Sequence, residues 1–131
     1  MRWGLIGGLS LTGVAVGLLS VFGYTGAHEI MHWTIAYLAC AATLGWALPS
    51  KHLQHGLAVG LLAGFAAPLV QVLLFGVYLA HNPGVASDLP PGANPEGLRW
   101  LTLALAPLSA IVSGIALGGL TWVAGRLLPH K

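Results

Sequence analysis

The segment GLAVGLLAGFAAPLVQVLLFGVYL at residues 56–79 contains no charged residue, and it decides the fold class. A membrane-spanning helix needs about 20 consecutive apolar residues to cross the hydrocarbon core of a bilayer, and this segment is long enough. The whole 131-residue chain has the same character, with 56% hydrophobic residues, 6% charged residues and a mean hydropathy of +0.84. Because ordinary soluble domains carry about 25% charged residues, this composition excludes a soluble globular fold.

Five basic and three acidic residues divide the chain into four long charge-free stretches, each sufficient to cross a bilayer. The links between the first three stretches are short, so neighbouring spans are predicted to run antiparallel. Pro68 and Pro107 fall inside the third and fourth stretches, where proline kinks a helix. We therefore predict an all-α protein, a four-helix transmembrane bundle that forms one domain over residues 1–131. Its expected spans are about 3–24, 28–48, 56–79 and 95–127.

Basic residues predict the orientation of the bundle, because Lys and Arg are enriched in cytoplasmic loops. One side of a four-span topology collects most of them: Arg2, Lys51, Arg126 and Lys131. The other side collects Arg99 and all three acids: Glu29, Asp88 and Glu96. The sequence thus predicts a multi-pass protein of the cell (inner or plasma) membrane with both termini in the cytoplasm. The segment 80–97, with four prolines, is predicted to be an outer loop between the third and fourth spans.

Small residues recur every four positions in several of the predicted spans. The stripes are Gly4 and Gly8, Gly13 and Gly17, Gly56, Gly60 and Gly64, and Ala110, Gly114 and Gly118. Such stripes let helix backbones approach closely in lipid. They indicate either internal packing of the four helices or a surface for a partner helix, and internal packing is the simpler explanation.

One motif in the chain could carry chemistry, the sequence HEIMH at residues 28–32. It matches the H-E-x-x-H pattern, in which two histidines one helical turn apart bind zinc and the glutamate between them activates the bound water. His28 and His32 are therefore candidate metal ligands, and Glu29 is the candidate catalytic base.

The motif and its place in a membrane helix resemble the intramembrane zinc proteases of the site-two protease kind. In that family a later span supplies an aspartate as the third zinc ligand, so the resemblance implies Asp88 in that role. His81 and Glu96 are alternative ligands on the same side of the membrane. The alternative function for this chain is accordingly an intramembrane zinc metalloprotease.

A structural interpretation also accounts for these residues. Glu29 falls in the first turn of a predicted helix, where the helix dipole favours a negative side chain. His28, His32 and His81 are then interfacial polar residues, or ligands of a haem or (bacterio)chlorophyll, because membrane histidines also bind these cofactors.

Other polar residues suggest no catalytic site. His52 and His55 lie beside Lys51 in a short link and are expected to be solvated. Gln71, deep in the third span, is expected to form a hydrogen bond to Thr102, Ser109 or Ser113 on the fourth.

The distribution of charge favours a non-enzymatic role. Basic residues scattered one or two at a time cannot form a patch for nucleic acid. No charge lies at the predicted membrane midplane, which argues against a pump or an ion-coupled transporter. We therefore expect a small accessory or scaffolding subunit whose partners are lipids and the other protein subunits of a larger membrane complex. Such a complex could be a bioenergetic one that contains pigment or haem.

Overall fold

The computed structural model describes residues 1–128, so Lys131 of the predicted basic side lies outside the described residues. The described residues are mostly helical and include no strand. Its elements are α1 (Trp3–Val21), the 3-10 turn η1 (Gly26–His28), α2 (Glu29–Ala47), α3 (His52–Leu73), α4 (Phe75–His81), α5 (Pro83–Ser87) and α6 (Pro95–Leu127). Four of these, α1, α2 (with η1), α3 and α6, are long and apolar enough to cross a membrane.

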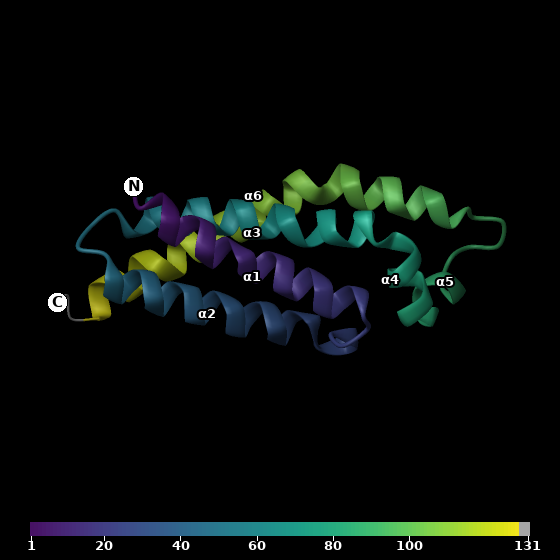
Figure 1. The fold of residues 1–131 in the computed structure, drawn as a ribbon, viewed down its shortest axis with the longest axis horizontal. Helices are drawn as coiled ribbons and strands as arrows, with labels where there is room; N and C mark the ends of the chain where they lie inside the picture. The colour runs from purple at the N-terminus through teal and green to yellow at the C-terminus, as the bar shows by residue number, and fades with distance from the viewer. Residues whose placement is uncertain (129–131) are drawn as a thin grey trace.

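The four long helices lie along the long axis of the molecule, with both ends of the described chain at one end (Figure 1). The α2–α3 link lies at this end too, whereas η1, α4 and α5 gather at the other. Helix α3 packs mainly against α1 and α6, and α2 packs mainly against α6. We call the first end the basic end, because it carries Arg2, Lys51 and Arg126, and the second the acidic end, because it carries Glu29, Asp88 and Glu96.

A buried hydrophobic cluster lies toward the basic end, where all four long helices contribute side chains. Its members are Ile6, Cys40, Ala41, Leu44, Leu48, Val59 and Leu117. Lipid tails are as apolar as these side chains, so inside a membrane the hydrophobic effect does not drive their burial in the protein. Close packing between the helices must supply the contact energy instead. The free cysteine of the chain is thus a core residue.

Glycines make the close contacts between these helices. A Cβ atom added at Gly60 on α3 would lie 2.7 Å from the Cα of Gly114 on α6. A Cβ at Gly17 on α1 would lie 3.0 Å from the Cα of Ala67 on α3. The distance at Gly60 is too short for a side chain, and the distance at Gly17 is shorter than an ordinary van der Waals contact, so the stripes on these faces serve internal packing.

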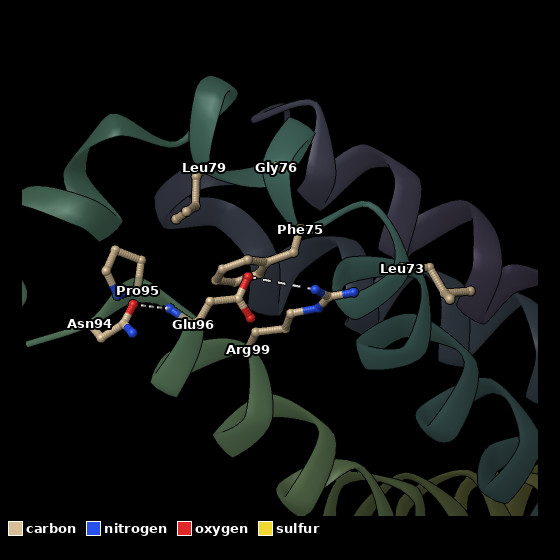
Figure 2. Close-up of a pocket in the computed structure, with 8 residues that line it drawn as sticks. All are labelled: Leu73, Phe75, Gly76, Leu79, Asn94, Pro95, Glu96 and Arg99. Atoms are coloured by element: carbon tan, nitrogen blue, oxygen red, sulfur yellow. Dashed lines mark hydrogen bonds and ion pairs between the residues drawn. The ribbon is translucent and has the colours of Figure 1, made fainter.

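Helix α3 differs in its bounds from the predicted third span. It begins at His52, continues through Pro68 and stops at Leu73, and a break at Leu74 separates it from α4. The Nε–H of Arg99 on α6 donates to the carbonyl oxygen of Val72 at 3.2 Å. Figure 2 shows Arg99 at this break with Glu96 beside it, and the Nη1 of Arg99 lies 3.6 Å from the Oε1 of Glu96. A cation at the C-terminal end of a helix satisfies its free carbonyls and its dipole, so Arg99 stabilises the end of α3.

The connection from α3 to α6 is only partly a loop, because α4 and α5 occupy residues 75–87 of it. The start of α6 agrees with the predicted start of the fourth span at about residue 95. Asn94 accepts a hydrogen bond from the backbone N–H of Glu96 at 3.0 Å, and Pro95 occupies the first helical position. Both features are common at helix N-termini.

Candidate functional site

The HEIMH motif straddles the junction of two helices instead of lying within one. His28 ends η1 with φ −103° and ψ 17°, and α2 begins at Glu29. The Nδ1 of His32 donates to the carbonyl oxygen of His28 at 2.8 Å. This bond leaves the Nε2 of His32 as the nitrogen that could bind a metal or a pigment.

The other candidate ligands lie on separate elements. His81 ends α4, its Nδ1 donates to the carbonyl oxygen of Val77 at 2.9 Å, and its ring packs edge-on against Phe22 at 5.5 Å between centroids. Asp88 follows α5 and is exposed. Glu96, the further alternative, is beside Arg99 on α6.

Within residues 1–128, no three His, Cys, Asp or Glu side chains lie close enough together to hold a metal ion. The structure therefore does not assemble His28, His32 and Asp88 into one site. A pigment or haem needs fewer protein ligands than a structural zinc ion. The ring of His28 and the Nε2 atoms of His32 and His81 form no hydrogen bond within the described chain, so these nitrogens are available for one.

Two of the candidate residues do meet, in a cavity of about 480 Å³ at the acidic end. We call it the acidic pocket. Its lining residues are Ser20, Thr25, Gly26, Ala27, Glu29, Tyr78, Asn82, Gly84, Val85 and Asp88. They come from the end of α1, from η1, from the start of α2, and from α4 and α5 with the residues that follow them.

A hydrogen-bond network holds the wall of the acidic pocket. The Nε2 of Gln71 on α3 donates to the hydroxyl of Ser20 at 2.8 Å. The Nδ2 of Asn82 donates to the carbonyl oxygens of Tyr78 at 2.8 Å and of Ser20 at 3.1 Å. The prediction that Gln71 bonds to the fourth span was wrong: its partner is on α1, because α3 presents Gln71 to that helix. The network ties the end of α1 to both α3 and α4.

The electrostatics of the acidic pocket are negative. Burial raises the pKa of the Tyr78 phenol above its usual value of 10.0, and the nearby Glu29 carboxylate raises that pKa further. Tyr78 is therefore neutral at ordinary pH and can donate a hydrogen bond. The lining contains two carboxylates and no Lys, Arg or His.

Thr25 is the polar group of the acidic pocket that the sequence did not reveal. The residue is only 3% exposed and lines the pocket. Among residues 1–128, no buried side-chain nitrogen or oxygen lacks a hydrogen-bond partner. No sequence pattern could have indicated the burial of Thr25, since it looks like an ordinary residue of a short link.

The prediction that His55 is solvated was wrong. At the basic end this residue is buried and has a structural role. It is 3% exposed. Its Nδ1 donates to the carbonyl oxygen of Lys51 at 2.9 Å, and its Nε2 accepts from the backbone N–H of Arg2 at 3.1 Å. The guanidinium of Arg2 donates to the carbonyl oxygen of Ala47 at 3.1 Å. Both ring nitrogens of His55 are therefore engaged, and the contacts join the starts of α1 and α3 to the end of α2.

No known protein family, curated protein or solved structure matches the chain. Conclusions about function therefore rest on the geometry of the chain itself.

Proposed function

We propose that the chain is a small integral membrane subunit that scaffolds a larger membrane complex through helix α1. The observation that carries the proposal is a glycine face of α1 that the bundle leaves uncovered. A Cβ added at Gly4, Gly7 or Gly8 would meet nothing within 4 Å.

The contrast with the other stripes supports this interpretation. Gly13 and Gly17 in the same helix pack against the backbone of α3, so the second half of α1 is used internally. The first half keeps the same spacing, from Gly4 to Gly8, on a side that the bundle does not touch. Glycine inside a helix costs about 0.5–1 kcal/mol relative to alanine, and a close helix contact in lipid offsets that cost. A helix of another subunit is the partner that fits this face.

The proposed orientation places the basic end in the cytoplasm and the acidic end outside the cell membrane. The support is that Arg2, Lys51 and Arg126 share one end and that the termini of the described chain lie there. In this orientation the Pro-rich segment that precedes α6 is on the outer side. There it can cover an exposed surface of a partner subunit.

The test is the mass of the native particle that carries the chain, extracted from its own membranes in a mild detergent. The proposal predicts an assembly with other polypeptides that the variant Gly8→Leu dissociates. A matched control is Gly119→Leu on α6, where the added side chain also meets nothing within 4 Å. A lone 13.5 kDa chain, or a homo-oligomer, in the wild-type preparation contradicts the proposal.

A further inference from the structure

We propose that a pocket at the basic end of the molecule binds the phosphate group of an anionic phospholipid. We call it the basic pocket. It is a cavity of about 580 Å³ whose lining includes Arg2, Ala47, Leu48, Ser50, Lys51 and His55. This volume is in the range of small-molecule sites, about 300–1,000 Å³. The inference does not depend on the scaffolding role proposed for the glycine face of α1.

The charge of the basic pocket selects an anion. Arg2 lines it beside the start of α1, Lys51 lines it beside the start of α3, and both residues are exposed. None of the described residues that line the pocket is acidic, because all three acids of the chain lie at the acidic end. A concave surface with charges of one sign concentrates the opposite charge. The expected ligand is therefore negatively charged.

A buried histidine holds the two basic residues in place. His55 is 3% exposed and lines the pocket. Its Nε2 accepts from the backbone N–H of Arg2 at 3.1 Å, and its Nδ1 donates to the carbonyl oxygen of Lys51 at 2.9 Å. One N–H of the Arg2 guanidinium donates to Ala47, and the others form no hydrogen bond within the described chain. The backbones of both cationic residues are thus fixed before a ligand arrives, which lowers the entropy cost of binding.

The start of α3 reinforces the preference for an anion. Lys51 is the N-cap residue of this 22-residue helix, and its side chain makes no capping hydrogen bond. The first N–H groups of a helix have no partner within the helix, and together with the helix dipole they attract phosphate groups. These backbone donors and the side chains of Arg2 and Lys51 favour the same kind of ligand.

The place of the basic pocket in the bundle selects a lipid as the source of the phosphate. The pocket lies at the ends of three candidate membrane spans, α1, α2 and α3. Trp3 and Trp46 adjoin its lining residues in the chain and are 67% and 55% exposed, and tryptophan prefers the headgroup region. Ala47 and Leu48 add an apolar wall that a free phosphate ion does not need. Basic pockets between transmembrane helices bind phosphate-bearing headgroups.

The experiment is native mass spectrometry of the purified full chain in detergent, titrated with short-chain phosphatidylglycerol. We expect a single phosphatidylglycerol molecule to bind each chain at low lipid concentration. Phosphatidylcholine of the same chain length should bind about tenfold more weakly, because Arg2 and Lys51 repel its choline cation.

Two variants test the basic residues. Arg2→Gln and Lys51→Asn should each weaken phosphatidylglycerol binding about fivefold, the usual effect of one cation beside an anionic headgroup. Asparagine is chosen at position 51 because Lys51 has φ 61°, a left-handed conformation that asparagine tolerates. Lys51→Arg keeps the charge and should retain binding.

The matched control is Arg126→Gln. It removes a cation from the same end of the protein but not from the basic pocket, because the Arg126 guanidinium lies 3.7 Å from the centre of the Trp122 ring on α6. This variant should change phosphatidylglycerol binding less than about twofold, since the charge that it removes is screened and distant from the phosphate.

The outcomes are distinct. Absence of phosphatidylglycerol binding by the folded wild-type chain overturns the inference, and so does equal binding of phosphatidylcholine. Equal weakening by Arg126→Gln also overturns it, because that result shows diffuse attraction by the whole basic end. Tighter binding of inorganic phosphate than of phosphatidylglycerol identifies a soluble anion and overturns the assignment to a lipid. If Arg2→Gln does not fold, Lys51→Asn, at an exposed position, still decides.

Discussion

The contact between α3 and α6 is predicted to fail when a methyl group is added at Gly60. A Cβ there would lie 2.7 Å from the Cα of Gly114, about 1 Å closer than an ordinary van der Waals contact, and the backbone carbonyl of Ser113 blocks the same space. Neither neighbour is a flexible side chain, so the two helices must separate. Overpacking of this kind costs about 1–3 kcal/mol, while alanine recovers about 0.5–1 kcal/mol of helix propensity. We expect Gly60→Ala to destabilise the bundle by about 1–2 kcal/mol.

The matched control is Gly119→Ala on α6, where the added methyl group meets nothing within 4 Å. Helix propensity alone then predicts an unchanged or slightly raised stability, by at most about 1 kcal/mol. The assay is reversible unfolding in mixed micelles titrated with a denaturing detergent, followed by far-ultraviolet circular dichroism. If Gly60→Ala is as stable as Gly119→Ala, the close α3–α6 contact described above is wrong.

Three further predictions concern the network, the orientation and the motif. Gln71→Leu should lower the free energy of unfolding by about 0.5–1.5 kcal/mol in the same assay, because it removes the hydrogen bond between α3 and α1; an unchanged stability would mean that the bond contributes nothing. In a Cys40→Ala background, a membrane-impermeant thiol reagent added to intact cells should label Ser87→Cys and not Ser50→Cys; the reverse pattern would invert the proposed orientation. Protein purified without chelators should contain no stoichiometric zinc and show no peptidase activity that Glu29→Gln removes, whereas finding both would establish the alternative zinc metalloprotease.

The sequence predicts a helix end well where residues next to that end determine it. The predicted fourth span and α6 both start at residue 95, where Asn94 makes a capping bond and proline occupies the first helical position. The end of α3 did not follow, because the apolar run continues past Leu73 without a break signal. There the decisive contact is tertiary, from Arg99 on α6, and no local pattern encodes it.

The sequence predicted which residues share the acidic end of the molecule, but it did not predict which of them lie together in one pocket. Charge distribution placed Glu29 and Asp88 on the same side of the membrane, and the structure brings both to one pocket. The spacing of His28 and His32 predicted a shared helical face, but α2 begins only after His28, so the motif spans a helix boundary. The burial of His55 depends on the backbone of Arg2, 53 positions away, and could not be inferred from its neighbours in the link.

The most direct test of the scaffolding proposal is site-specific photo-cross-linking in native membranes. A photoreactive residue replaces Leu11, which is 63% exposed one helical turn from Gly8 on α1, and in a separate variant it replaces Ile115, which is 66% exposed on α6. The proposal predicts a cross-link from position 11 to another polypeptide, its loss in the Gly8→Leu variant, and a weaker or absent protein adduct from position 115. Lipid adducts alone from position 11, or equal protein adducts from both positions, would contradict the role of the glycine face of α1.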